Sequence, residues 1–133
     1  HLQRLMQHPG VELFINVMWR ELDMAMRQGP SSNLAGLLDV VFGTDAWADI
    51  AKKHDIELRA ELTMNLIRTQ VDAKWATYMM MLGDNGRTRY ILLHLTNNRH
   101  GRDLMKDCLW NAFPDGQFYA RRTDDPVVGL GIF

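Results

Sequence analysis

The sequence has little of several features that define whole classes of protein. A single cysteine, Cys108, among 133 residues excludes an internal disulfide and any metal site built from several cysteines. The longest wholly apolar run, Tyr78 to Leu82, is far shorter than the roughly 20 residues of a membrane-spanning helix. Fifteen Lys and Arg side chains stand against sixteen Asp and Glu, which excludes a strongly basic nucleic-acid coat and an acidic tail. We therefore expect no membrane association and, from the scarce cysteine, a reducing cytoplasmic location.

The features that are present are typical of one globular domain. Hydrophobic residues make up 47% of the chain and charged residues 23%, values that allow a buried core. The length suits a single domain over residues 1–133. The chain begins His-Leu-Gln, without an initiator methionine or a signal-peptide pattern, so we expect a piece of a longer protein.

Four helices are predicted in the first half of the chain. Apolar residues at steps of three and four place the first over about 11–28. The others are expected over about 34–42, 46–53 and 55–73. Gly43 is predicted to end the second of them, and the side chain of Asp55 to cap the start of the last.

A β-hairpin is predicted next. Two apolar runs, 75–82 and 88–96, flank an Asn-Gly pair, which favours a type I′ turn because both residues tolerate positive φ. Both strands are apolar on both faces, so we expect the hairpin to be covered on more than one side. A helix over about 101–113 and a third strand over 117–121 follow, and the apolar residues 127–133 are expected to pack onto the domain or a neighbour. The fold class is therefore α+β, and helices followed by a two-stranded ribbon outline a winged helix-turn-helix.

Residues that could perform catalysis are sparse. His94 lies inside an apolar strand, which favours a hydrogen-bonded core histidine over a ligand. No two histidines have the spacing of a zinc-binding helix. Cys108 lies more than two helical turns from His100, too far for a Cys–His dyad, and its place on the apolar stripe of its helix predicts a buried, inert side chain. We expect neither an enzyme nor a bound cofactor or metal.

Positive charge gathers in one part of the chain. Between residues 85 and 106, five basic residues oppose only Asp103, for a local net charge of +4. Arginines at a hairpin tip and a helix N-terminus favour contact with phosphate, although a solvated surface explains them nearly as well. The predicted nucleic-acid-binding residues are Arg87, Arg89, Arg99, His100, Arg102 and Lys106.

Three stretches resemble the C-terminal part of the three-Cys-motif partner proteins. They are residues 14–21 (FINVMWRE), 42–47 (FGTDAW) and 90–110 (YILLHLTNNRHGRDLMKDCLW). Together they cover about residues 11–113. The matching positions are Asn16, Arg20, Gly43, Trp47, Thr96, Asn97, Gly101, Met105, Lys106 and Trp110.

This resemblance implies a bacterial, archaeal or phage protein that accompanies a radical-SAM-like protein with a three-cysteine motif. It also implies a winged-helix-like domain that follows a methyltransferase-like domain, of which only the former is matched here. In that fold the FGTDAW step is the helix-turn-helix corner and the hairpin is the wing. Asn16 and Arg20, four residues apart on the predicted first helix, would share one face and serve either a structural hydrogen bond to the Asn97 turn or a binding surface.

Two functions follow from these observations. The first is a non-catalytic winged-helix module that binds nucleic acid through the arginine cluster. The second is a protein-interaction or dimerisation module of the same fold, which the near-zero net charge favours.

Overall fold

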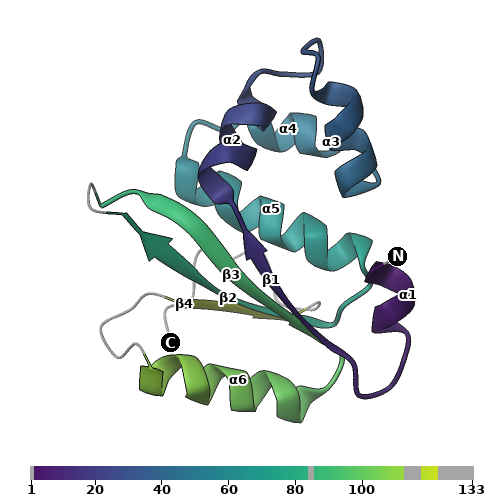
Figure 1. Ribbon diagram of the computed structural model, residues 1–133, viewed down its shortest axis with the longest axis vertical. Helices are drawn as coiled ribbons and strands as arrows, with labels where there is room; N and C mark the ends of the chain where they lie inside the picture. The colour runs from purple at the N-terminus through teal and green to yellow at the C-terminus, as the bar shows by residue number, and fades with distance from the viewer. Residues whose placement is uncertain (1, 84–85, 113–117, 123–133) are drawn as a thin grey trace.

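The computed structural model describes residues 2–83, 86–112 and 118–122, the last as backbone, and has a mixed α+β architecture (Figure 1). The elements in chain order are α1 (Leu2–Met6), β1 (Glu12–Val17), α2 (Trp19–Arg27), α3 (Ala35–Phe42), α4 (Trp47–Ala51), α5 (Ile56–Gln70), β2 (Trp75–Leu82), β3 (Thr88–Thr96), α6 (Arg99–Ala112) and β4 (Phe118–Arg122). No helix among these residues is long and apolar enough to cross a membrane.

The strands form one antiparallel sheet in the order β1-β3-β2-β4. The predicted hairpin of β2 and β3 is confirmed at both strand bounds, with Trp75 opposite Thr96 and a register shift between Met81 and Leu82. Gly86 has a positive φ of 73°, but it is not a central residue of the predicted two-residue type I′ turn. The Gly86 N–H donates to the Gly83 carbonyl and the Gly83 N–H donates to the Arg87 carbonyl, so the loop is one residue longer than predicted and Gly86 is its last residue. The other turn residues, 84 and 85, lie outside the described residues. The predicted third strand is present as β4, one residue later in the chain.

The prediction of one helix over residues 11–28 is wrong. Residues 12–17 form β1, which pairs with β3, and the helix α2 begins only at Trp19. Exposure alternates along β1, with Leu13 and Ile15 turned inward and Phe14 outward. The outward Phe14 produced the helical spacing in the sequence, whereas the β-branched Ile15 and Val17 favour a strand once a pairing partner is available.

The two faces of the sheet are covered by different helices (Figure 1). On one face Ile91, Leu93 and Leu95 of β3 are fully buried in a core that includes Trp19 of α2 and Met64 of α5. The other face is covered by α6, whose Leu109 packs with Met79 of β2 in a smaller cluster. The expectation that the hairpin is covered on more than one side is therefore confirmed.

The predicted helices after residue 30 are confirmed, with bounds a few residues shorter. Gly43 ends α3 with a φ of 69°, and the Asp55 carboxylate caps α5 by accepting hydrogen bonds from the backbone N–H groups of Glu57 and Leu58. Met26, Leu38, Phe42 and Trp47 form a second apolar cluster among α2, α3 and α4. Because α1 is present and β1 replaces part of a helix, five helices and one strand precede the hairpin, not the four helices predicted.

The helix α6 begins two residues earlier than expected, and Asn98 accepts a hydrogen bond from the His100 backbone N–H at 2.9 Å, as an N-cap residue does. Its buried side is narrower than predicted. Leu109 is buried, but Leu104 and Cys108 are exposed, so the prediction of a buried Cys108 is wrong. The predicted packing of residues 127–133 lies outside the described residues.

Candidate functional site

The predicted arginine cluster divides into two groups that lie at opposite ends of β3. Arg87 and Arg89 lie at the hairpin tip, where β3 begins, whereas Arg99, His100 and Arg102 lie in the first turn of α6, after β3 has ended. At about 3.3 Å per residue, the strand separates the two groups by more than about 20 Å. The six predicted residues therefore do not form one patch, because the length of β3 separates Arg87 and Arg89 from the residues on α6.

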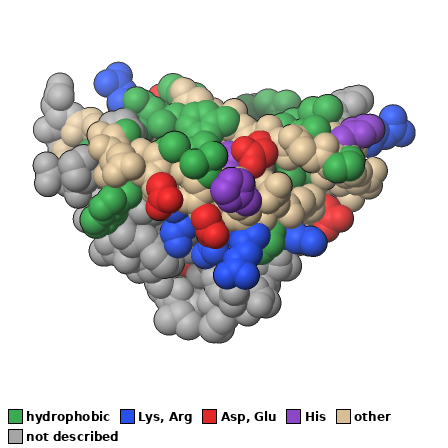
Figure 2. All heavy atoms as spheres, turned by 90° about the horizontal axis from the view of Figure 1, so that it is seen from below, with side chains coloured by type: hydrophobic (Ala, Val, Ile, Leu, Met, Phe, Trp, Pro, Cys, Tyr) green, Lys and Arg blue, Asp and Glu red, His purple; other side chains and the backbone are tan. Residues whose placement is uncertain are grey.

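The α6 group is mixed in charge. Arg102 forms an ion pair with Asp103 at 3.1 Å, and only 16% of its side chain is exposed. Lys106, the last member of the group, is itself engaged in an interaction. On the α6 side of the molecule, Figure 2 shows basic side chains beside acidic ones rather than a field of one sign. The positive charge at this end of the molecule is therefore only partly compensated, because Arg99 is exposed and forms no ion pair among the described residues.

The hairpin group is completed by arginines from another element. Arg20 and Arg27 of α2 line one pocket together with Arg87 and Arg89, and the volume of this pocket is about 470 Å³. We call it the four-arginine pocket. Its other lining residues come from α2, the start of α5 and the hairpin: Trp19, Asp23, Met24, Ile56, Gly83 and Thr88.

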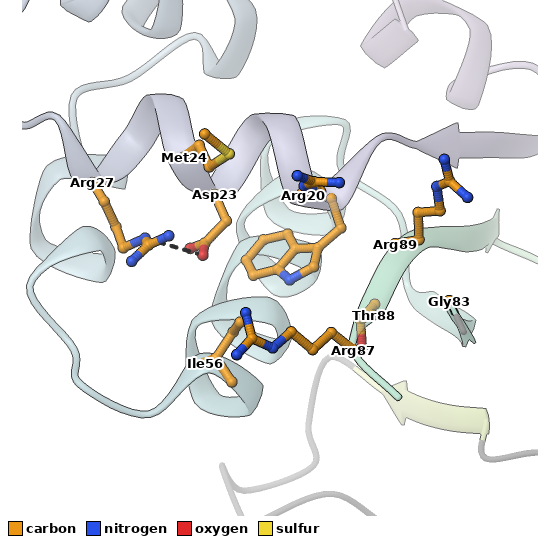
Figure 3. A pocket seen from close by; sticks show the side chains of 10 residues that line it. Arg20, Asp23, Met24, Arg27, Ile56, Gly83, Arg87, Thr88 and Arg89 are labelled. Carbon is orange, nitrogen blue, oxygen red and sulfur yellow. Dashed lines mark ion pairs between the residues drawn. The ribbon is translucent and has the colours of Figure 1, made fainter. Parts of the chain in front are cut away.

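Figure 3 shows how the four arginines are arranged along the pocket. Arg27 lies at one end beside Asp23, and Arg89 lies at the other end. Arg87 extends from the hairpin toward Ile56, across the space between these ends. The guanidinium groups therefore line the pocket along its length and do not gather at one point.

The arginine side of α2 is held in place by a buried ion pair. Asp23 is 2% exposed, and its two carboxylate oxygens accept hydrogen bonds from Arg59 of α5 at 2.8 Å and 3.0 Å. Arg59 also donates to the backbone carbonyls of Lys53 and His54. Arg27, which is half exposed, adds a second ion pair to Asp23 at 3.2 Å. This network joins α2 to the start of α5 and so fixes the two helical walls of the pocket.

The electrostatics of the pocket favour an anion. The lining holds four arginines and one aspartate, a net charge of +3, and the carboxylate of Asp23 is already paired with Arg59 and Arg27. Among the described residues, neither Arg20 nor Arg89 forms an ion pair, whereas Arg27 is paired with Asp23 and Arg87 is engaged in another interaction. Hydrogen bonding to Asp23 raises the pKa of Arg59, against the opposing effect of burial, so the cation behind the pocket stays charged.

Sequence reasoning missed this pocket, although a signal for half of it was present. Arg20, Asp23 or Met24, and Arg27 follow one another at steps of three and four, which is the spacing of a single helix face. The wrong prediction of one helix over residues 11–28 hid this face, because it placed Arg20 on the same helix face as Asn16. In the structure Asn16 lies exposed on β1 and Arg20 lies on α2, so the prediction that they share a helix face is wrong.

The Asn97 turn is tied to other partners than the predicted ones. Asn97 accepts a hydrogen bond from the Lys74 backbone N–H at 2.7 Å and donates one to the Met6 carbonyl at 3.0 Å. It therefore joins the end of β3 to the start of β2 and to α1. Neither Asn16 nor Arg20 takes part, so the predicted hydrogen bond between them and this turn is wrong.

Several other positions of the quoted motifs have structural roles. Trp47 is buried and donates from Nε1 to Asp39 at 2.7 Å. Thr96 donates to the Glu12 carboxylate, and Gly101 lies so close to that carboxylate that any Cβ there would collide with it. Trp110 is half exposed on α6. Among the matching positions of the three stretches, Arg20 lines the four-arginine pocket and the others do not.

His94 is a hydrogen-bonded core histidine, as predicted. It is 2% exposed, and its Nε2 lies 3.2 Å from a carboxylate oxygen of Glu12. Within the part of the chain that the structure describes, no group of three or more His, Cys, Asp and Glu side chains is arranged to hold a metal ion.

Comparisons of the chain with protein-family models, with curated proteins and with solved structures gave no match. The site is therefore interpreted from its own geometry.

Proposed function

We propose that this chain is a non-catalytic nucleic-acid-binding module of winged-helix type, related to the three-Cys-motif partner proteins. The observation that supports nucleic-acid binding is the four-arginine pocket, in which two arginines of the hairpin tip and two of α2 line one concave surface. In this proposal the hairpin of β2 and β3 is the wing, and the α3–Gly43–α4 corner is the turn between two helices.

The physical argument is based on the charge and position of the arginines. A nucleic-acid backbone presents a row of phosphates, and arginine binds phosphate through a planar fork of N–H donors. Because the guanidinium groups are spread along the pocket, they can contact more than one phosphate of a strand that enters it. The chain as a whole has a net charge of −1, so the binding energy would come from this local surface and not from a general positive field.

Replacing the two hairpin arginines tests the proposal. We expect the double variant R87A/R89A to bind duplex or single-stranded oligonucleotides of mixed sequence more weakly, and the slope of log K against log salt to fall by about 2. The matched control is R99A/R102Q, which removes the same number of charges at the other end of β3 and should leave both quantities close to wild type. Fluorescence anisotropy over a series of salt concentrations measures both.

Two outcomes would refute the assignment to this pocket. One is an affinity of R87A/R89A that equals that of the wild type. The other is an equal loss in both variants, which would show that binding follows the net charge and not the position of the arginines.

A second candidate function is supported by the exposed surface of α3. Leu37, Val40 and Val41 lie on one side of this helix, and Val40 is 79% exposed. A contiguous apolar patch of this kind marks protein-interaction sites. The chain would then be an interaction or dimerisation module, and the resemblance noted above suggests a radical-SAM-like protein with a three-cysteine motif as the partner.

Light scattering tests self-association through α3. If this surface forms a dimer, the mass of the wild-type chain should rise from that of the monomer to twice that value with concentration, and V40D should stay monomeric. S31D, an exposed change outside the α3 helix, serves as the control and should associate as the wild type does. A wild-type chain that remains monomeric throughout would exclude self-association through α3.

A further inference from the structure

We infer that the four-arginine pocket takes a phosphomonoester, the terminal phosphate of a nucleotide, in preference to the internal phosphates of a strand. This inference rests on the proposed function and specifies the part of the nucleic acid that enters the site. A terminal phosphate can come from the end of a strand or from a free nucleotide, and the two sources share the chemistry that the pocket would recognise.

The first argument is the shape of the site. The pocket has a volume of about 470 Å³, within the range of pockets that hold one small ligand. It is bounded by α2 on one side and by Gly83 and Thr88 of the hairpin on another. An internal phosphate is flanked by nucleotides on both sides, so it can lie across the mouth of such a site. A chain end has only one neighbour and can enter it.

The second argument is the charge of the site. A phosphomonoester carries about −1.5 to −2 charges at neutral pH, whereas an internal phosphodiester carries one. Because Asp23 is paired with Arg59 and Arg27, its carboxylate does little to repel an incoming dianion. Arg20 and Arg89, which form no ion pair among the described residues, remain available as charged donors.

The third argument is the lining between the arginines. Met24 and Ile56 are each about half exposed, and they add apolar surface to a pocket whose other side chains are mainly cationic. Among the described residues, the Thr88 hydroxyl donates only to the weak acceptor Met80 Sδ, at 3.6 Å. It can therefore turn to donate to a phosphate oxygen. A nucleotide end combines a doubly charged group with the carbon face of a sugar, and this matches the mixed lining.

The experiment compares one strand with and without a terminal phosphate. Three internally labelled single strands of about 12 nucleotides carry a 5′-phosphate, a 3′-phosphate or no terminal phosphate. We expect at least one phosphorylated strand to bind about tenfold more tightly than the unphosphorylated one near neutral pH. The R20Q/R89Q variant should reduce that preference to less than about twofold. R99Q, on the other end of β3, should retain it.

The pH dependence provides an independent readout. The second pKa of a phosphomonoester is about 6, so lowering the pH to about 5 removes most of its second charge while the arginines stay protonated. The preference for the phosphorylated strand should therefore shrink at low pH. A preference that does not change with pH would contradict recognition of the dianion.

The outcomes separate the inference from the proposed function. Equal binding of all three strands, lost together in R87A/R89A, would overturn the inference and keep the proposed function. Binding of adenosine 5′-monophosphate by calorimetry, lost in R20Q/R89Q and without binding of any strand, would support the inference with a free nucleotide as the source and overturn the proposed function. Binding of neither nucleotide nor strand would overturn both.

Discussion

Replacing Asp23 by alanine should lower the free energy of unfolding by about 3 to 5 kcal/mol, the usual cost of breaking a buried ion pair by removing one partner. The reason is that D23A leaves the Arg59 guanidinium buried with, among the described residues, only the carbonyls of Lys53 and His54 as acceptors. Both side chains of the pair are almost wholly buried. Urea unfolding followed by circular dichroism measures the change.

The matched control is D49A. Asp49 pairs with Lys52 at 3.5 Å on the surface of α4, where both side chains are mostly exposed. Exposed pairs of this kind contribute at most about 1 kcal/mol. A loss of less than about 1 kcal/mol in D23A, similar to that in the control, would show that Asp23 and Arg59 are not held together in the folded protein.

A double variant separates the pair from its surroundings. Replacing both charges by apolar side chains of similar size, D23L/R59M, leaves no buried unpaired charge and should cost less than D23A alone. Because the pKa of Arg59 is raised on folding, its contribution is fully present at neutral pH and is lost only as the pH rises through that higher value. The comparison can therefore be made at any pH near neutrality.

Elements that depend on local chemistry could be predicted from the sequence. The Asn-Gly pair with apolar runs on both sides predicted the hairpin with the strand bounds that the structure has. Gly43 and Asp55 likewise predicted the end of α3 and the start of α5, because a left-handed glycine and a capping carboxylate act within one helical turn.

Elements that depend on distant partners could not be predicted in the same way. Residues 12–17 fit a helical spacing and become a strand only because β3, about 80 residues later, provides a pairing partner. The prediction of the binding residues as one patch was wrong for the same reason. Charges close in sequence, such as Arg89 and Arg99, are separated by the length of β3, whereas Arg20 and Arg89 line one pocket through contacts that only the tertiary fold creates.

Replacing Trp47 by alanine is the second change with a large expected effect. Trp47 is 1% exposed and packs with Met26, Leu38 and Phe42 in the cluster that joins α2, α3 and α4. Removal of a buried tryptophan side chain costs about 3 to 5 kcal/mol, because apolar contacts are lost and a cavity remains. We therefore expect W47A to unfold at a much lower urea concentration than the wild type.

Two further variants divide this effect between packing and hydrogen bonding. W47F keeps a ring in the cluster but removes the Nε1–H group that donates to Asp39 at 2.7 Å, and D39A removes the acceptor. Because Asp39 is exposed and can be solvated by water, D39A should cost only about 1 to 2 kcal/mol. If D39A were as damaging as W47A, the hydrogen bond and not the buried ring would hold α3 against α4.

Because α2 carries Arg20 and Arg27 and also contributes Met26 to this cluster, loss of the ring should also loosen one wall of the four-arginine pocket. W47A should then bind oligonucleotides more weakly even at temperatures where it is still folded, whereas D39A should bind as the wild type does.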